Sequence, residues 1–398
     1  MSEHIKAFVE EQMKLKQEKW IGFRKHLHQH PELSFQEKET QAFIARQLDE
    51  MGVSYEKGGD DLRYIIAVLN PEEKRTIALR ADIDALPILE ENQTDYASQN
   101  PGIMHACGHD VHTSCLLGAL DILSEMKEDL PYRVVAVFQP AEEKLPGGAS
   151  LLLEKGILKP YAPQLILGQH VHPPLLAGQL GFKPGPYMAS ADEIRITVNG
   201  KGGHAATPHE CVDPVFLSSL LIVQLQSLMS RLKNPIEPGV LSMGKIYSDG
   251  GATNVIPQRV FIEGTLRCMN DEFRELALSK IQAIAKGLSQ SYDADIEVNI
   301  QRGYPVLKND RELTPKVKQQ AESFLGQEQV ADLPMRMSAE DFAWYTNDMP
   351  GVFYRLGTGR KDAVNYSVHH PQFDIDHEAI GVGAGFMAYL AATAPEWI

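Results

Sequence analysis

The chain has 398 residues, of which 43% are hydrophobic and 23% charged, and its formal net charge is −15 at pH 7. These proportions are ordinary for a soluble globular protein, and the length exceeds what one hydrophobic core usually supports, so we expect two domains. The acidic charge argues against nucleic acid and anionic membranes as partners, because both require a basic surface.

The N-terminal segment 1–20 mixes charges throughout and lacks the apolar core of a signal peptide. No apolar run approaches the about 18 residues that a membrane-spanning helix needs, so we expect no membrane segment. Four cysteines are too few for a disulfide scaffold. We therefore expect a cytoplasmic protein in which Cys115, Cys211 and Cys268 are small buried hydrophobes.

Short β-branched runs alternate with helical patterns in the first half of the chain. The predicted strands are 63–69, 76–81, 133–139 and 164–169, and the predicted helices are 111–126 and 147–155. This alternation indicates an α/β layer architecture with a largely parallel sheet. Sites in such sheets form beyond the carboxyl ends of the strands. Polar side chains follow three of the strands: Asp82 and Asp84, then Glu142 and Glu143, then His170.

The pattern changes from about residue 187. The predicted elements are a strand at 193–199, a helix at 213–231, strands at 240–247 and 258–267, a helix at 271–289 and a strand at 294–301. This β-α-β-β-α-β order is typical of the ferredoxin-like split motif. We expect residues 187–301 to form a small domain inserted into a larger α/β domain made of 1–186 and 302–398, which ends in a helix from about 377. Three consecutive modules are the alternative.

Metal-ligand side chains are concentrated in HACGHDVH, residues 105–112. Cys107 and His109 are two positions apart and project to one side of an extended backbone. Thiolate and imidazole are ligands that zinc and similar ions prefer. Gly108 between them would let the backbone bend closely around an ion. A buried cysteine beside surface histidines explains any one of these residues, but the density of ligand types favours a metal site.

Three further segments end in ligand-type side chains: QPAEE at 139–143, GQHVHP at 168–173 and SVHHPQF at 367–373. Adjacent residues point in different directions, so Glu142 and Glu143 can divide metal binding and proton transfer between them. Metal coordination lowers the pKa of water from about 15.7 to about 7, and a carboxylate that takes a proton can return it to a leaving amine. Each segment alone also suits a solvated carboxylate pair or a core histidine, but together they predict metal-dependent amide hydrolysis.

Together these segments resemble the M20 family of metallopeptidases, in particular its amidohydrolase branch of aminoacylases, hippurate hydrolases and auxin-conjugate hydrolases. The resemblance follows the chain in order over nearly its whole length. Its segments are RKHLHQHPELSFQE (24–37), LRADIDALPI (79–88), HACGHDVH (105–112), QPAEE (139–143), GQHVHP (168–173), GKGGHAATPH (200–209), NVIP (254–257), GTLR (264–267), AEDFAWY (339–345) and HHPQF (369–373).

The resemblance implies a two-metal centre, with zinc or manganese as the ions and cobalt or nickel as further candidates. The ligands that it implies are Cys107, His109, Glu143, His170 and His369. It also implies that Glu142 is the general base and acid for a metal-activated water, and that Asp84 orients one of the ligands.

Two positions depart from the family's pattern. Asp82 stands where other branches have a metal-binding histidine, which is typical of the amidohydrolase branch. His370 follows His369 where relatives have a small residue, so His370 is an alternative ligand, although the alignment with Pro371 favours His369.

Four polar residues near the motifs each have two interpretations. His105 and His112 are either donors to the metal ligands or surface groups. Glu340 and Asp341 either brace the site or cap the following helix, and capping is the commoner arrangement.

For the inserted domain, the resemblance implies a lid that also forms a homodimer. His204 would polarise the scissile carbonyl, in related enzymes often from the partner subunit, and Asn254 and Arg267 would contact the substrate. The implied reaction is hydrolysis of an N-acyl-amino acid to a carboxylic acid and a free amino acid. A dipeptidase or carboxypeptidase of the same superfamily is the alternative enzyme. A non-catalytic protein that binds metal or a conjugate is the alternative outside catalysis, and it would not need Glu142.

Overall fold

The computed structural model describes residues 2–398. The chain forms two compact units, which are described separately. The first contains the chain up to Gly185 together with Lys308–Pro334 and Asp341–Ile398, and the second contains Pro186–Leu307 and Met335–Glu340.

The two units differ from the expected boundaries at two short segments and at one residue. Residues 302–307 and 335–340, and at the other boundary Pro186, belong to the second unit, whereas the sequence pattern places them in the first. Backbone hydrogen bonds explain the second of these segments, since Arg336 N donates to Tyr187 O and Ala189 N donates to Ser338 O. Such pairing between distant segments leaves no periodic signal in the sequence.

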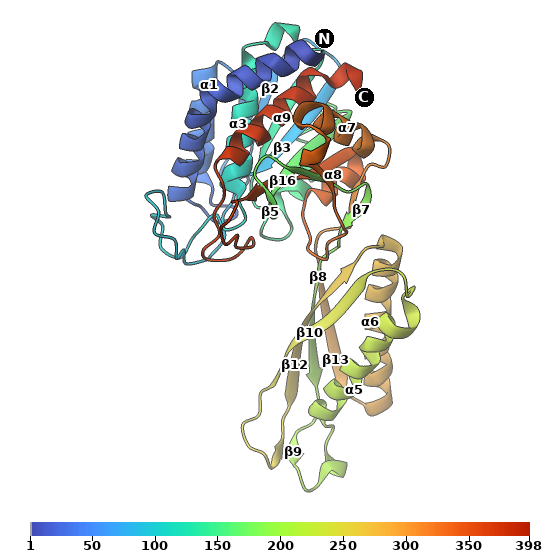
Figure 1. Ribbon diagram of the computed structural model, residues 1–398. Coiled ribbons are helices and arrows are strands. Elements are labelled where there is room, and N and C mark those ends of the chain that lie inside the picture. The colour runs from blue at the N-terminus through green and yellow to red at the C-terminus, as the bar shows by residue number, and fades with distance from the viewer. Residues whose placement is uncertain (1) are drawn as a thin grey trace. The chain divides into compact units, whose positions relative to one another are not determined.

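An eight-stranded mixed sheet forms the first unit, in the order β1-β2-β4-β3-β5-β16-β6-β15 (Figure 1). The strands are β1 (Ser54–Lys57), β2 (Ile65–Leu69), β3 (Thr76–Asp82), β4 (Arg133–Gln139), β5 (Leu165–Leu176), β6 (Leu180–Phe182), β15 (Val330–Asp332) and β16 (Gly351–Gly359). Strand β3 is parallel to both β4 and β5, and β5 is parallel to β16. The four strands predicted in this part of the chain are therefore present.

The prediction of a largely parallel sheet holds for the central strands β4, β3, β5 and β16 but is wrong on both sides of them. On one side, β6 is antiparallel to β16. On the other side, β2 is antiparallel to β1 and to β4. The physical reason is loop length, because parallel neighbours need a crossover of about a dozen residues or more. The segment 58–64 between β1 and β2 is too short for one, so these two strands pair antiparallel.

Helices cover this sheet, and α1, α3 and α9 lie side by side against it (Figure 1). The helices of the first unit are α1 (Ser2–Gln29), α2 (Lys38–Met51), α3 (His109–Ser124), α4 (Gly148–Glu154), α7 (Leu313–Leu325), α8 (Ala343–Asp348) and α9 (Glu378–Ala392). Helix α3 is buried from His109 to Leu123. Its charged residues therefore need partners. Asp110 accepts a hydrogen bond of 2.8 Å from Arg24 Nε, and Asp121 accepts one of 3.0 Å from Trp20 Nε1.

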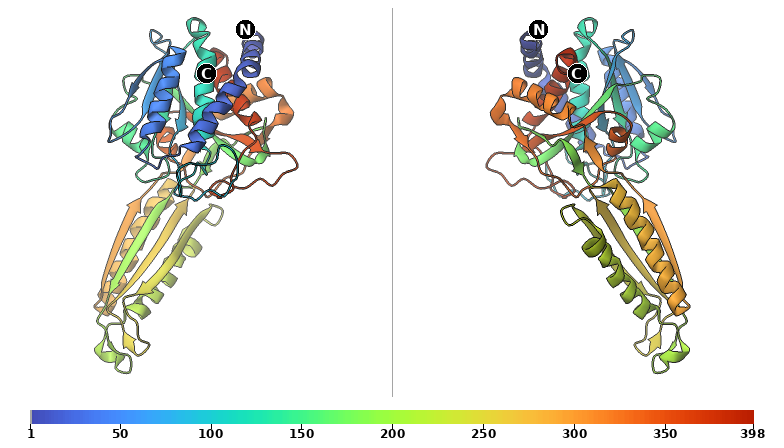
Figure 2. Two further views of the ribbon diagram at one scale, coloured as in Figure 1. Left: turned by 90° about the vertical axis from the view of Figure 1, so that its left-hand side faces the viewer. Right: turned by 90° about the vertical axis from the view of Figure 1, so that its right-hand side faces the viewer.

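The second unit contains a four-stranded antiparallel sheet in the order β10-β12-β8-β13. Its elements are β8 (Asp192–Asn199), β9 (Gly203–His204), α5 (Pro214–Ser227), β10 (Gly239–Ser248), β11 (Val255–Ile256), β12 (Arg259–Cys268), α6 (Asp271–Tyr292) and β13 (Asp295–Arg302). Figure 2 shows α5 and α6 on the same face of this sheet. Strand β8 alternates accordingly, because Ile194, Ile196 and Val198 are buried beneath the helices while Glu193 and Arg195 are exposed. The six elements predicted here are present in the predicted order.

One helix contradicts the expectation that no segment is long and apolar enough to cross a membrane. The helix Pro214–Leu232, in which a π-helical turn continues α5, contains an 18-residue stretch with a mean hydropathy of 1.4. Leu217, Leu221 and Leu225 of this helix belong to the core of the second unit. The apolar character of its inner face therefore has a structural explanation within the fold.

Candidate metal centre and active site

The carboxyl ends of β3 and β4 place four predicted site residues at one edge of the central sheet. Asp82 ends β3 and Asp84 follows it, while Glu142 and Glu143 follow β4. Because β3 and β4 are adjacent and parallel, these ends meet at the same edge.

His170 reaches this edge from within a strand. The prediction that its strand ends at residue 169 is wrong, because β5 continues to Leu176 by pairing with β16. The pairing between β5 and β3 stops at Gly168, however. His170 therefore still lies beyond the end of β3, as the site requires.

Two overlapping groups of ligand-type side chains form at this edge. The first group is Cys107, His109 and His170, and the second is Cys107, Glu143 and His369. Within each group the candidate ligand atoms all lie within 4.8 Å of one another. Cys107 Sγ is 3.4 Å from His170 Nε2, and Glu143 Oε1 is 3.3 Å from His369 Nε2. The structure thus brings all five expected ligands together, with Cys107 common to both groups.

Two buried ligand atoms in these groups have no hydrogen-bond partner among residues 2–398. They are His109 Nε2 and Glu143 Oε1, which lie 3.9 Å apart. Leaving a buried polar atom unpaired costs free energy, so we expect both atoms to bind a partner that is not part of the chain. A divalent cation satisfies both through their lone pairs, and mixed thiol, imidazole and carboxylate donors suit such ions. The residues present therefore fit divalent metal.

Gly108 permits the close approach of Cys107 and His109. Its φ of +82° lies in the left-handed region, and a Cβ atom at this position would lie 2.6 Å from Val171 Cγ2. The sequence indicates that glycine is needed here for a bend around an ion. The structure adds a packing reason, because Val171 of β5 fills the space where a side chain would project.

Asp84 fixes the orientation of His109. Its Oδ1 lies 3.2 Å from His109 Nδ1, so that the other ring nitrogen, Nε2, faces the ligand group. Asp84 Oδ2 accepts hydrogen bonds from Ser34 Oγ at 2.6 Å and from Glu143 N at 3.0 Å. Burial acts to raise the pKa of Asp84, but the hydrogen bonds from His109 and Ser34 outweigh it and hold the pKa below its usual range.

His112 and Asp82 are both engaged in hydrogen bonds. Val171 N donates to His112 Nε2 at 2.9 Å, which requires the proton of this neutral ring to be on Nδ1. Nδ1 then donates to Asp82 Oδ1 at 2.6 Å, and Arg80 donates to Asp82 Oδ2 at 2.6 Å. Burial lowers the pKa of His112, which keeps the ring neutral. Both ring nitrogens of His112 are therefore engaged, so this ring has no lone pair left for a metal in this arrangement. Asp82 still has lone pairs on both oxygens, and its Oδ2 lies 3.7 Å from His109 Nε2.

His105 is buried rather than exposed. It is 1% exposed, and neither ring nitrogen has a hydrogen-bond partner among the described residues. Burial lowers its pKa to about 4, so the ring is neutral at pH 7. Of the two interpretations given above, a surface group is wrong for both His105 and His112.

Cys107 lies in surroundings that disfavour its thiolate in the absence of a cation. Burial is the main cause, followed by the charges of Glu143 and Glu142, and together they raise the pKa of the thiol well above its ordinary value. A divalent cation reverses this effect, because its charge stabilises the thiolate.

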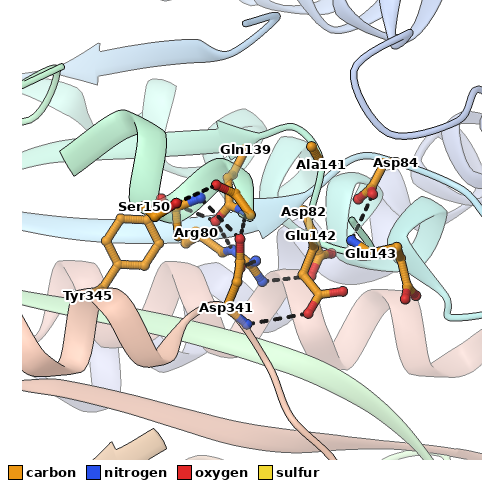
Figure 3. A network of polar contacts seen from close by, with 12 residues as sticks. Arg80, Asp82, Asp84, Gln139, Ala141, Glu142, Glu143, Ser150, Asp341 and Tyr345 are labelled. Carbon is orange, nitrogen blue, oxygen red and sulfur yellow. Dashed lines mark hydrogen bonds and ion pairs between the residues drawn. The ribbon is translucent and has the colours of Figure 1, made fainter. Parts of the chain in front are cut away.

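Glu142 extends toward Asp341 (Figure 3), and one of its oxygens also lies within 4.8 Å of ligand-type atoms of His109 and Glu143. Glu142 Oε1 accepts a hydrogen bond of 3.4 Å from Asp341 N. The Asp341 side chain is fixed in turn by Arg80 at 2.7 Å and by Gln139 at 2.7 Å, and Tyr345 Oη donates to Gln139 Oε1 at 3.1 Å. Asp341 therefore braces the site, whereas Glu340 belongs to the second unit.

His369 and His370 have different surroundings. His369 adopts a φ of +68° and donates from its backbone to Ala106 O at 2.8 Å, which directs its ring toward Glu143. The ring of His370 stacks on Tyr366 at a centroid distance of 4.3 Å. His370 Nδ1 also accepts a hydrogen bond from Gln372 N. The geometry therefore favours His369 over His370 as the ligand.

The three residues of the second unit that are predicted to act on the substrate do not all lie close together. His204 in β9 pairs with Val255 in β11, and Ala205 N donates to Asn254 O at 3.0 Å, so His204 and Asn254 share one small ribbon. Arg267 lies near the other end of the sheet, where it pairs with Val240 and hydrogen-bonds to Thr265. Figure 1 shows β9 beyond one end of the four-stranded sheet. The three residues are thus not brought together within one chain.

Three polar residues that support the site are absent from the sequence-based assignment. Ser34 binds Asp84, and Arg80 joins Asp82 to Asp341. Gln139 joins Arg80 to Asp341. Two of them, Arg80 and Gln139, could have been found from the sequence, because a polar residue inside an apolar strand needs a buried partner. Arg80 lies in IALRA and Gln139 ends VVAVFQ.

The first unit is a mixed α/β unit in which thiol, imidazole and carboxylate donors meet at the ends of the central strands. This arrangement is typical of a metal-binding α/β enzyme. The chain belongs to peptidase family M20/M25/M40, whose profile matches residues 78–393. This finding confirms the family resemblance drawn from the motifs.

Similar proteins agree with this assignment. The chain is 40% identical over 373 residues to the N-acetyl-L-cysteine deacetylase of Bacillus subtilis, covering 94% of this chain and 87% of that protein. It is 36% identical over 393 residues to the N-acetyldiaminopimelate deacetylase of Enterococcus faecalis, covering 96% and 99%. Among solved structures, a dinuclear metal-binding peptidase of the M20 family from Bacillus subtilis superposes with a TM-score of 0.82 at 34% identity, covering 97% and 100%. The chain is accordingly a hydrolase that acts on amide bonds.

Proposed function

We propose that this chain hydrolyses N-acyl-amino acids to a carboxylic acid and a free amino acid. The observation that carries this proposal is the division between two adjacent carboxylates. Glu143 Oε1 lies among the ligand atoms, whereas Glu142 turns to Asp341. Together with His109 these glutamates still form a group with ligand-type atoms within 4.8 Å. A proton-transfer group therefore lies beside a metal site, as amide hydrolysis requires.

The residues that would hold two divalent ions are Cys107, His109, Glu143, His170 and His369, and Cys107 is common to both ligand groups. Zinc or manganese suits these donors, and cobalt or nickel does too. When bound, the ions would supply a Lewis acid for the carbonyl and an acidified water. Glu142 takes a proton from the attacking water and returns it to the leaving amine.

We propose that the second unit is a ferredoxin-like lid and dimerisation domain. Its strand order and its two helices on one sheet face support the first part. The dimer is supported by the edge strand β10, on which Ile246 is 52% and Tyr247 51% exposed, and by α5, on which Phe216 is 49% and Val223 70% exposed. A second copy that pairs along this edge would cover both features. We also propose a cytoplasmic location, where Cys107 would stay reduced.

The position of Arg267 supports completion of the site by a partner subunit. Arg259 lies in β12 beside the ribbon that carries His204 and Asn254. Arg267 comes eight positions later in the same strand, a distance of about 27 Å at strand spacing. An N-acyl-amino acid spans roughly two residues, or about 7 Å. His204 and Arg267 of one chain therefore cannot both contact the same substrate molecule. His204 of one chain and Arg267 of another can. In this proposal His204 polarises the scissile carbonyl of the partner's substrate, and Asn254 and Arg267 contact substrate.

An N-acetyl-amino acid should be hydrolysed with a kcat/KM at least about tenfold above that of the dipeptide with a free amine. The reason is that Asp82 and Asp84 already accept hydrogen bonds from Arg80, His112 and Ser34. They are therefore poor partners for a buried ammonium group, whose desolvation would go uncompensated. The measurement is a matched pair of substrates after reconstitution with zinc and, separately, manganese. Faster cleavage of the dipeptide would favour the dipeptidase or carboxypeptidase alternative, and metal binding without any turnover would favour a binding protein.

Mixing two inactive variants should restore activity. In a mixed dimer of Glu142→Gln and His204→Ala subunits, one site has Glu142 from one chain and His204 from the other. Random mixing should give about a quarter of the wild-type activity, because half of the dimers are mixed and each has one intact site of two. Subunits with two different tags are co-expressed, and the doubly tagged dimer is also purified and assayed; it should show about half of the wild-type activity, because one of its two sites is intact. Activity no higher than that of the unmixed variants would show that His204 acts within its own chain.

A further inference from the structure

Glu37 is a buried carboxyl group that the proposed chemistry does not use. Its side chain is 0% exposed, and it comes directly before α2 without capping that helix. Glu37 Oε1 instead accepts two backbone hydrogen bonds of 2.9 Å, from Phe35 N and from Ala141 N. One of these partners is a near neighbour, but Ala141 comes 104 positions later and directly precedes Glu142.

Ala141 has an unusual backbone conformation at the start of the two-glutamate segment. Its φ of +54° lies in the left-handed region, which is unfavourable for a residue with a Cβ atom. Both of its backbone polar groups are fixed, because Ala141 N donates to Glu37 and Ala141 O accepts from Gly148 N at 2.9 Å. Such a conformation persists only where the surroundings enforce it.

The backbone conformation of Ala141 determines where the side chains of the next two residues point. After this residue, Glu143 N donates to Asp84 at 3.0 Å while the Glu142 side chain turns to Asp341 (Figure 3). A change in the backbone at Ala141 would rotate both carboxylates together. The precision of this turn therefore matters to the metal ligand and to the proton-transfer group alike.

We infer that Glu37 is a positioning residue, which holds Ala141 in the left-handed conformation that directs Glu142 and Glu143 to their separate tasks. The inference rests on the proposed function for the roles of these two glutamates. Burial, reinforced by the charge of Asp84, raises the pKa of Glu37 to about 8. A neutral carboxyl group at this position still offers an oxygen to Ala141 N without adding negative charge to the site.

The test compares three variants with a substrate that the wild-type enzyme hydrolyses. Glu37→Leu removes the oxygen that accepts from Ala141 N and should lower kcat about a hundredfold, since a small misplacement of a catalytic group has an effect of this size, with KM much less affected. Glu37→Gln keeps an oxygen of the same reach and a neutral side chain, so it should retain most of the activity. Adding Ala141→Gly to Glu37→Leu should restore part of kcat, because glycine adopts a positive φ without the penalty of a Cβ atom.

Controls separate positioning from folding. Gln36→Leu makes a comparable change at the neighbouring exposed residue and should leave kcat unchanged. The folded fraction from urea unfolding corrects each kcat, and Glu37→Ala replaces Glu37→Leu if the latter does not fold. A corrected kcat for Glu37→Leu within twofold of wild type would overturn the inference. So would equal losses in Glu37→Gln and Glu37→Leu, or the absence of rescue by Ala141→Gly.

A second measurement keeps the inference separate from the proposed function. Titration with Zn²⁺ reports on Glu143 without any substrate, and Glu37→Leu should bind the ion at least about tenfold more weakly than Glu37→Gln, the scale on which groups that orient ligands act. If the wild type hydrolyses no N-acyl-amino acid, the proposed function fails, while this difference in affinity still decides the role of Glu37. Equal affinities in the two variants would overturn it.

Discussion

Glu142→Gln should lower kcat by about 10²–10⁴-fold, the contribution typical of a general acid–base group, and should leave the metal content unchanged. The amide keeps the shape of the side chain and its hydrogen bond from Asp341 N, but it cannot take a proton. The ligand groups that contain Cys107 do not include Glu142, so the ions should remain bound. Steady-state kinetics and elemental analysis of the purified variant give both quantities.

The neighbouring glutamate provides the matched comparison. Glu143→Gln should lose metal as well as activity, because it weakens a ligand whose Oε1 lies 3.3 Å from His369 Nε2. Glu128→Gln, at an exposed position, should change neither quantity. Wild-type turnover in Glu142→Gln would rule out its role as base, and parallel loss of metal in both site variants would mean that the two carboxylates do not divide their tasks.

Removing metal with a chelator should abolish activity and lower the thermal stability of the protein. Without ions, His109 Nε2 and Glu143 Oε1 are buried without partners, and Cys107 loses the cation that stabilises its thiolate. An ion present at 100 times its Kd stabilises the folded state by about 2.7 kcal/mol. Restoring zinc or manganese should recover both the melting temperature and the turnover. Differential scanning fluorimetry and a hydrolysis assay on the same samples measure the two effects.

The inactive Glu142→Gln variant is the control for this experiment. It should show the same metal-dependent shift in melting temperature as the wild type, because its ligands are intact, although it turns over no substrate. Full activity in protein that elemental analysis shows to be metal-free would exclude a metal-dependent reaction. A shift in the wild type that is absent from Glu142→Gln would instead indicate that Glu142 itself binds the ion.

The ligand residues could be found from the sequence because strand patterns and short motifs are local. Cys107 and His109 are neighbours in one segment, and Glu142 and Glu143 directly follow a predicted strand. The parallel pairing of β3 with β4 and β5 then accounts for their convergence. The antiparallel position of β2 and the extension of β5 to Leu176 were not predictable in the same way, because each depends on a partner strand distant in the chain.

By itself, the sequence determined the order of the elements in the second unit, four strands of the central sheet, the family, and the residue types that meet at the site. All of these follow from local periodicity and from motifs in sequence order. Only the tertiary structure decided how each side chain is used. It engaged both ring nitrogens of His112 in hydrogen bonds, and it separated His369 from His370. It also joined Glu37 to Ala141. The physical reason is that a buried polar group takes whichever partner the packing of distant segments brings within hydrogen-bond reach.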